Sequence, residues 1–432
     1  MKRFVACIAG IVIAALGHHA MAQDSVVEGP GVELGEGTVL HPQAHLDTGY
    51  ISNLFYQEPG DGPRGPVGVG VIRVGVSAAL ASELNRPVDD VEAPLAETPP
   101  EDSEDTRAVI PSTDYRLTGR IDYTQHLSGD FDVKGQNGLT SVAIGLDGHL
   151  VLLNDQTLSV LLDDSLTRDT RPRNFESAGN LNRLNNRLKG GLRYRPGQGA
   201  LQISASYENL LDRFESDQSA FANRMNQLLR GRAEWQFLPI TRFFLDTSFG
   251  FFGPLDTSDK PSSTPLRILL GGASAITEST TLRAHIGFGK GFYSAGQDFT
   301  MALFGAEFGL RYRVDGRFTV AYQYDFQDAL SANFYRDHAV LAKVDQQIDQ
   351  FLLALTGSAR LRGYRSVLTS IGGGQRDDVI LQAGAKAHYI YREWLAFTAE
   401  VDAVTDSTDY MAAGDDPSYN RVEVMLGAQG AL

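Results

Sequence analysis

Charged side chains recur at every second position along several segments of this 432-residue chain. In one of them, Arg230, Arg232 and Glu234 alternate with apolar or small residues. A β-strand directs successive side chains to opposite faces, so such a segment carries its charges on one face and its apolar groups on the other. Charges of both signs on a shared face suit either a hydrated wall stiffened by ion pairs or a conduit that selects polar or anionic solutes.

The same alternation predicts which side chains lie on this polar face. If the sheet closes on itself, this face lines the lumen. The predicted basic residues are Arg116, Arg120, Arg193, Arg230, Arg232, Arg242, Arg283, Arg311, Arg313, Arg360 and Arg362. The predicted acidic residues include Glu234, Asp246, Glu307, Asp325, Glu400 and Asp402. Many of them are spaced to pair across neighbouring strands, and both interpretations, wall and conduit, remain open.

Catalytic and metal-binding motifs are absent from the sequence, which has no H-E-x-x-H, G-x-S-x-G or Walker A pattern. The glycine-rich stretch 287–291 lies inside an alternating segment, so we expect its glycines to give room on the lumen side of a strand. The histidines are scattered, without metal-ligand spacing. We therefore predict no metal, no cofactor and no enzymatic activity, although a Ser–His pair formed from distant segments remains an alternative.

The N-terminus has the three parts of an export signal. A basic start, an apolar run over 4–16 and the triplet Ala20-Met21-Ala22 predict a signal peptide over 1–22, cleaved after Ala22. The single cysteine, Cys7, lies in this signal, so the mature chain is expected to lack disulfides and cysteine-bound metals. The apolar run is shorter than the roughly 20 residues of a spanning helix. The net charge of −15 argues against nucleic acid as a partner.

Period-two alternation dominates the mature chain and predicts about 18 strands. The predicted strands are 38–55, 65–80, 112–127, 139–153, 157–170, 185–195, 200–213, 223–237, 241–253, 264–277, 280–293, 298–314, 317–331, 333–348, 350–366, 376–391, 394–408 and 418–432. Many of these segments are two to three times as long as the usual strand of a soluble sandwich.

The links between these segments alternate between short turns and longer polar loops after the third strand. Short links such as 238–240 and 392–393 alternate with longer ones such as 171–184 and 409–417. Short periplasmic turns, longer outer loops and an even strand number are typical of outer-membrane barrels. We therefore predict an all-β fold, a transmembrane antiparallel up-and-down β-barrel in the outer membrane, with lipid against its apolar face. Aromatic residues near strand ends, including Phe249, Phe252, Tyr293 and Tyr389, are expected to form its interfacial girdles.

One link breaks this rule. Residues 81–111 should form a periplasmic turn, but they are long, and 83–107 contain nine acids, two bases and four prolines. This composition favours a flexible acidic insertion, either a tolerated solvated segment or a docking segment for a periplasmic partner. The predicted organisation is thus a signal peptide, a periplasmic N-terminal segment over 23–37 and a barrel over 38–432.

The last segment, 418–432, alternates up to an apolar final residue, Leu432. A final strand of this kind is similar to the signal read by the outer-membrane barrel assembly machinery, which we expect to be a partner. Leu432 stands where an aromatic residue is usual, which bears on the efficiency of assembly.

The first predicted strand carries a motif that indicates a family. His41-Pro42 is followed by the string Gly49-Tyr50-Ile51-Ser52-Asn53-Leu54-Phe55. This pattern resembles the opening of the outer-membrane β-barrel porin 2 family. The resemblance implies an outer-membrane barrel related to those linked to exopolysaccharide secretion in myxobacteria, and hence a role in polymer export.

Three functions follow from these expectations. The first is the exit pore for a secreted or surface polysaccharide, which needs a periplasmic partner such as a polysaccharide co-polymerase or export protein. The alternative is a general diffusion porin for small hydrophilic solutes, which needs a constriction that no loop in the sequence reveals. The third is a surface anchor or an outer-membrane enzyme without a transport role.

Overall fold

The computed structural model describes residues 27, 29–35, 37–58, 65–82, 112–128, 131–134, 137–170, 182–255, 260–369, 372–411 and 417–432. The predicted signal peptide with its cleavage site lies outside the described residues, and so does the acidic insertion from residue 83 to 111.

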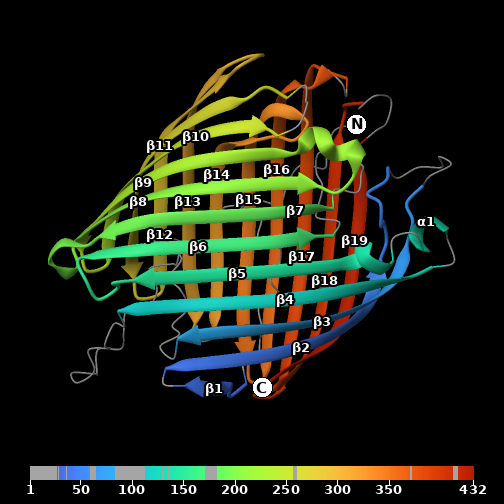
Figure 1. Ribbon diagram of the computed structural model, residues 1–432, viewed down its shortest axis with the longest axis horizontal. Coiled ribbons are helices and arrows are strands. Elements are labelled where there is room, and N and C mark those ends of the chain that lie inside the picture. The colour runs from blue at the N-terminus through green and yellow to red at the C-terminus, as the bar shows by residue number, and fades with distance from the viewer. Residues whose placement is uncertain are drawn as a thin grey trace.

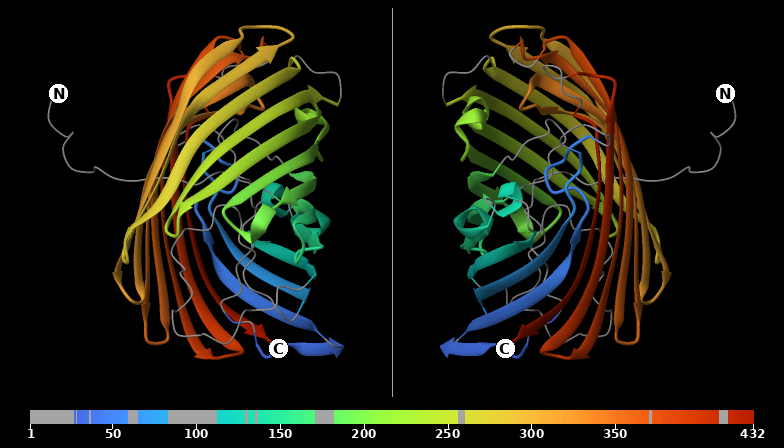
Figure 2. Two further views of the ribbon diagram at one scale, coloured as in Figure 1. Left: turned by 90° about the vertical axis from the view of Figure 1, so that its left-hand side faces the viewer. Right: turned by 90° about the vertical axis from the view of Figure 1, so that its right-hand side faces the viewer.

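One antiparallel sheet of 19 strands forms the molecule, and its 18 long strands close into a barrel because β19 pairs with β2. The two walls curve around a common interior (Figures 1 and 2). The barrel strands are β2 (Thr38–Ile51), β3 (Val69–Ser82), β4 (Thr113–Leu127), β5 (Val142–Leu152), β6 (Leu158–Asp169), β7 (Arg183–Tyr194), β8 (Leu201–Phe214), β9 (Arg224–Leu238), β10 (Thr241–Pro254), β11 (Ser263–Thr277), β12 (Thr280–Tyr293), β13 (Phe299–Arg313), β14 (Gly316–Asp328), β15 (Ala332–Ile348), β16 (Phe351–Val367), β17 (Gln375–Arg392), β18 (Leu395–Thr408) and β19 (Tyr419–Ala431). This confirms the predicted up-and-down barrel.

The strand ends match the prediction closely except on the two sides of the β2–β3 loop, where the second strand, expected from residue 65, begins at Val69. The first strand was expected to reach residue 55 but ends at Ile51. Residues 52–57 leave the wall instead, and Leu54 and Tyr56 are buried inside the barrel. A run of apolar residues that continues a strand pattern can equally continue into a packed loop, because both bury the same side chains.

The outer face is apolar, as lipid requires. Large side chains such as Leu46 and Ile286 point outward with 55 % and 67 % of their surface exposed. At the end with the short turns, Trp235 and Phe237 pack edge to face, with ring centroids 5.1 Å apart, as in an interfacial girdle. Not every predicted girdle residue lies outside: Tyr293 stacks inward on Phe334, with ring centroids 5.9 Å apart.

A short strand that the sequence did not predict, β1 (Val32–Gly35), completes the seam of the barrel. The β19–β2 ladder ends at Ala431 opposite Gln43, and the Leu432 amide donates to the Pro42 carbonyl at 3.0 Å. Without β1, the backbone groups of β2 before Pro42 would have no partner strand on this side. β1 pairs with Thr38 to Leu40 there and satisfies backbone groups that lipid or water would otherwise meet.

Among the described residues, four short helical segments lie in the links: α1 (Phe131–Lys134), η1 (Gly138–Ser141), η2 (Pro196–Gln198) and η3 (Asp217–Ala222). None of the described helices has the length and apolarity needed to cross a membrane. The described parts of the long links, and with them α1, η1 and η3, lie at one end of the barrel, and the short turns lie at the other, which by the usual rule faces the periplasm.

Candidate functional site: a charged lumen with an inward-held hairpin

Strand alternation puts the predicted lumen residues on the face opposite the apolar one. They are distributed as follows: Arg116 and Arg120 on β4, Arg193 on β7, Arg230, Arg232 and Glu234 on β9, Arg242 and Asp246 on β10, Arg283 on β12, Glu307, Arg311 and Arg313 on β13, Asp325 on β14, Arg360 and Arg362 on β16, and Glu400 and Asp402 on β18.

Several of these residues meet across strands. Arg232 Nε lies 3.1 Å from Glu234 Oε2, and its Nη1 lies 3.5 Å from Asp246 Oδ2. Arg242 reaches the other oxygen of Glu234 at 3.5 Å. Arg362 holds Asp337 in a two-point contact at 2.8 and 2.7 Å, and its guanidinium lies 3.7 Å from the ring centre of Tyr335. Such pairs suit the first interpretation of the charges, a wall stiffened by ion pairs, which stays a prediction.

Further pairs join predicted residues to other charges of the same inner face, and strand alternation also predicts Asp122 and Glu208 to face the lumen. Their closest contacts are Arg120–Asp122 at 3.9 Å, Arg230–Glu208 at 3.6 Å, Glu400–Lys386 at 3.5 Å and Asp325–Arg267 at 3.3 Å.

The periplasmic end of β12–β14 is different, because positive charges gather there. Arg311 and Arg317 lie directly opposite each other on β13 and β14, and Arg313 follows two positions on. Like charges in facing positions are unfavourable unless an anion or solvent screens them. In the described part of the chain no carboxylate lies within 4 Å of Arg313, Arg317 or Arg283, although Glu307 faces Arg283 in register and Asp345 faces Arg317. We call Arg283, Arg311, Arg313 and Arg317 the arginine mouth.

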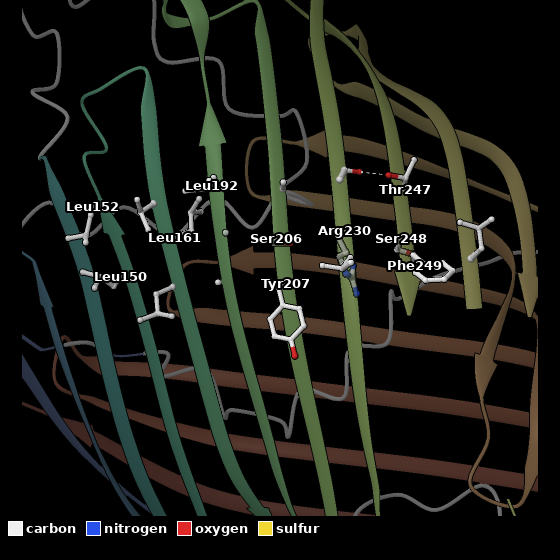
Figure 3. A pocket seen from close by; sticks show the side chains of 18 residues that line it. Leu150, Leu152, Leu161, Leu192, Ser206, Tyr207, Arg230, Thr247, Ser248 and Phe249 are labelled. Carbon is white, nitrogen blue, oxygen red and sulfur yellow. Dashed lines mark hydrogen bonds between the residues drawn. The ribbon is translucent and has the colours of Figure 1, made fainter. Parts of the chain in front are cut away.

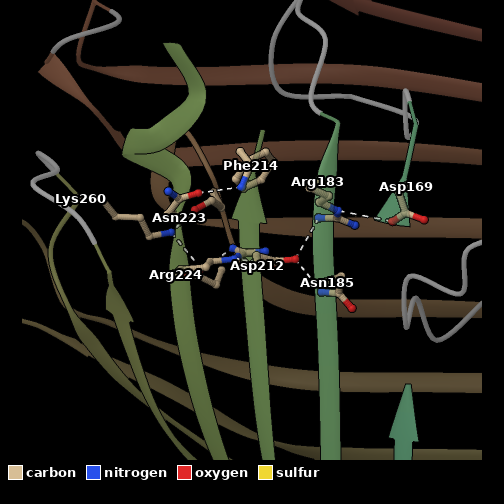
Figure 4. Close-up of polar contacts among 10 residues, drawn as sticks. Asp169, Arg183, Asn185, Asp212, Phe214, Asn223, Arg224 and Lys260 are labelled. Atoms are coloured by element: carbon tan, nitrogen blue, oxygen red, sulfur yellow. Dashed lines mark hydrogen bonds and ion pairs between the residues drawn. The ribbon is translucent and has the colours of Figure 1, made fainter. Parts of the chain in front are cut away.

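A buried ionic network lies at the opposite end (Figure 4). Asp212, with 1 % of its surface exposed, accepts hydrogen bonds from Asn185 at 2.6 Å and from Arg224 Nε at 2.9 Å. Arg183 Nη1 lies 3.5 Å from the same carboxylate, and its Nε lies 3.5 Å from Asp169. Strand alternation would have assigned Asp212 and Arg224 to the lumen, but nothing in the sequence indicates that they join one network.

The network extends to a distant hairpin. Arg224 Nη1 lies 2.8 Å from Asp328 Oδ2, and Lys260 Nζ lies 2.9 Å from the same oxygen and also donates to the Ala329 carbonyl. Asp328 ends β14, and four strands, β10 to β13, lie between it and the start of β9 along the wall. The β13–β14 ladder stops at Phe304 opposite Tyr324, so the tip of the β14–β15 hairpin leaves the wall and folds over the inner face of β11–β13.

Aromatic and apolar contacts hold the hairpin tip, residues 325–335, in this position. Phe326 packs edge to face on Phe299, with centroids 4.5 Å apart, and Phe299 lies 4.1 Å from Phe334. Leu330 packs against Phe214, which is itself buried. A Cβ at Gly289 would stand 2.5 Å from the Phe326 ring, so only glycine leaves the space that this ring fills. This agrees with the expectation that glycines of 287–291 give room on the lumen side.

The residues of the family-like motif have structural roles at the seam. Asn53 is fully buried; its amide donates to the carbonyls of Gln57 at 2.7 Å and Asn420 at 3.1 Å, and its oxygen accepts from the Gln57 amide at 2.9 Å. Ser52 Oγ accepts from the Val422 amide at 2.7 Å. A Cβ at Gly49 would meet the Val424 carbonyl at 2.0 Å, so β2 and β19 pack too closely there for a side chain.

The remaining motif residues lie around this turn and along β2. Tyr50 points outward and its hydroxyl covers Gly68, whereas Phe55 packs on the buried cluster around Leu54. His41 lies beside Gly31, and Pro42 bonds to the C-terminus as described above. The motif therefore closes the barrel and holds the β2–β3 loop inside.

No group of three or more His, Cys, Asp or Glu side chains within the described residues is arranged to hold a metal ion. The lumen instead offers fixed charges and hydrogen-bonding groups on a rigid wall, which can bind a passing solute weakly and exclude others by size and charge.

A closed 18-strand barrel, apolar outside and charged inside, defines an outer-membrane-type β-barrel protein. No family model matches the sequence, and no curated protein does. The fold is similar to that of OpdK from Pseudomonas aeruginosa, solved with vanillate, at 9 % identity and TM-score 0.45, covering 91 % of this chain and 99 % of that one. It is also similar to OccAB4 from Acinetobacter baumannii (11 %, TM-score 0.47, 92 % and 99 %) and to a BenF-like porin from Pseudomonas fluorescens (11 %, TM-score 0.48, 91 % and 99 %). Similarity at this level carries no argument about function.

Proposed function

We propose that this protein is an outer-membrane diffusion channel for small hydrophilic solutes and that it favours anions. The observation that carries the proposal is the hairpin tip held inside the lumen by Asp328. A diffusion channel needs a constriction made by an inward-folded segment, and the sequence alone revealed none. The polysaccharide-export reading was the leading expectation, but it has no support beyond the motif around Asn53, whose residues serve barrel closure.

The preference for anions rests on the arginine mouth. Most other charged side chains of the lumen form ion pairs within the wall. The two charges of such a pair oppose each other, so the pair attracts a passing ion only weakly. Arg313 and Arg317 have no such partner among the described residues, and a positive ring attracts anions and repels cations at close range. A small carboxylate or phosphate that has passed the hairpin would meet these guanidinium groups before reaching the periplasm.

The test uses the full mature chain, inserted into planar lipid bilayers and into liposomes. We expect discrete conductance steps, a reversal potential of anion-selective sign in a KCl gradient, and liposome swelling that falls steeply with the size of a neutral sugar. The absence of conductance, or swelling that continues with large oligosaccharides, would contradict a narrow diffusion channel.

A gene deletion separates this proposal from export. We expect unchanged surface polysaccharide and slower uptake of small anionic solutes, restored by complementation. Loss of surface polymer that complementation restores would instead identify an export conduit. In that case the acidic insertion over 81–111 would be the first segment to examine for a periplasmic co-polymerase contact.

A further inference from the structure

The outer face of β5–β11 carries a groove with a volume of about 860 Å³ (Figure 3). Outward-pointing side chains such as Leu192, Tyr207 and Leu229 form its walls. Gly190 and Gly231 form part of its floor, and no atom of the described residues lies within 4 Å of the place that a Cβ on Gly190 would occupy. The groove is therefore an open, apolar concavity on the side of the barrel that faces lipid.

Polar side chains lie in the next row of the same wall, towards the end with the long loops. Leu229 of the groove pairs in register with Tyr207. Two residues further along each strand, and therefore on the same face, Gln227 pairs with Asn209. Neither amide has a hydrogen-bond partner in the described part of the chain, although both point to the apolar side. Unpaired amides are unfavourable against hydrocarbon, so this row suits a ligand that offers hydrogen-bonding groups just above its apolar part.

A cation completes the series. Arg213 lies four positions beyond Asn209 on β8, points outward and is exposed. Arg213 is twelve positions from Leu201, which begins β8, and at the usual strand tilt this corresponds to about 30 Å along the barrel axis. The apolar band of such barrels is about 25 Å tall, so Arg213 lies just beyond its outer edge. Its neighbour Arg168 is neutralised by Glu215, with Nη2 to Oε2 at 2.8 Å, whereas Arg213 has no carboxylate partner within the described ranges. The nearest acid in the polar row, Asp164, bonds to Asn186 at 2.8 Å.

We propose that this groove is a binding site for the phosphorylated, acylated glycolipid of the outer leaflet. Acyl chains fill the concavity, amide and hydroxyl groups of the sugar bond to Asn209 and Gln227, and a phosphate pairs with Arg213. The order along the wall, from apolar groove to neutral amides to a single cation, matches the order of groups along such a lipid. Lipid would then be a specific ligand of β5–β11 as well as the solvent of the whole wall.

The test measures lipid bound to the purified full-length protein in detergent, by native mass spectrometry during titration with lipid A. Gly190→Leu fills the groove without a clash, and Arg213→Gln removes the cation. Matched controls are Gly357→Leu, where a Cβ has no neighbour closer than 4.0 Å, and Arg336→Gln, an exposed arginine on β15. We expect Arg213→Gln to weaken binding about tenfold and Gly190→Leu to weaken it at least as much, with neither control changing it.

Three results would overturn the proposal. Equal binding of lipid A to all four variants would mean that the groove holds no specific lipid. Equal binding of phosphatidylglycerol and lipid A would mean that the groove binds acyl chains in general and does not recognise the sugar of a glycolipid. Association of the wild-type chain into oligomers that Gly190→Leu disperses would assign the groove to a second copy of the chain. Single-channel conductance of each variant serves as the folding check, because all four positions point away from the lumen.

Discussion

Arg224 on β9 and Asp328 at the end of β14 lie 2.8 Å apart, although four strands of the wall separate β9 from β14. This contact exists only because the β14–β15 hairpin leaves the wall and folds over the inner face of β11–β13. The constriction that we propose for the channel thus depends on a few ionic and aromatic contacts at the tip of one hairpin.

Substitution of Asp328 tests this dependence directly. Asp328→Asn removes the carboxylate that Lys260 and Arg224 share, so the hairpin tip should detach and the channel should widen. We expect a larger and noisier single-channel conductance, and faster swelling of liposomes with sugars that the wild type excludes. Asp377→Asn is the matched control, because that acid is 67 % exposed and its pair with Arg365 is a surface one. Unchanged conductance in Asp328→Asn would show that the hairpin tip does not form the constriction.

The arginine mouth predicts a change of selectivity without a change of size. In Arg313→Gln/Arg317→Gln, two unpaired positive charges disappear from the periplasmic end, so the reversal potential in a KCl gradient should move towards the cation-selective side. Sugar size exclusion should stay the same, because the hairpin is untouched. Arg336→Gln, on the outer face, should leave the potential unchanged. A double variant that keeps full anion preference would show that other charges set it.

The buried network predicts a loss of stability at Asp212. Asp212→Asn leaves Arg183 and Arg224 beside a neutral amide in a buried site, and breaking buried pairs in this way typically costs about 3–5 kcal/mol. Denaturant unfolding of the barrel in detergent measures the difference. Asp155→Asn, in an exposed turn, should change the free energy of unfolding by less than about 1 kcal/mol. Equal stability of the two variants would mean that water reaches the network freely.

Asn53 predicts a second stability effect, at the seam. Asn53→Ala removes three hydrogen bonds and leaves the Gln57 amide and the Asn420 carbonyl without this partner. We expect a loss of about 2 kcal/mol or more in the free energy of unfolding, measured in detergent. Gln156→Ala, an exposed turn amide, is the control. If the two variants unfold alike, the motif does not hold the β2–β3 loop.

The sequence by itself determined the barrel: its strand number, the ends of most strands, the apolar outside and the charged inside. Each of these depends on period-two alternation or on turn residues, which are local properties that a chain shows without its fold. The positions of Arg232, Glu234 and Asp246 on the inner face follow from the same parity.

Only the tertiary structure decided which of these charges meet and where the lumen narrows. Asp328, Lys260 and Phe326 lie far from Arg224 in sequence, and no periodicity predicts that a short hairpin bends inward once its ladder to β13 ends. The same holds for β1, because a strand of four residues has no pattern of its own and forms where the C-terminus leaves the edge of β2 unpaired. Such contacts depend on the closure of the whole barrel, which brings distant strand ends to one place.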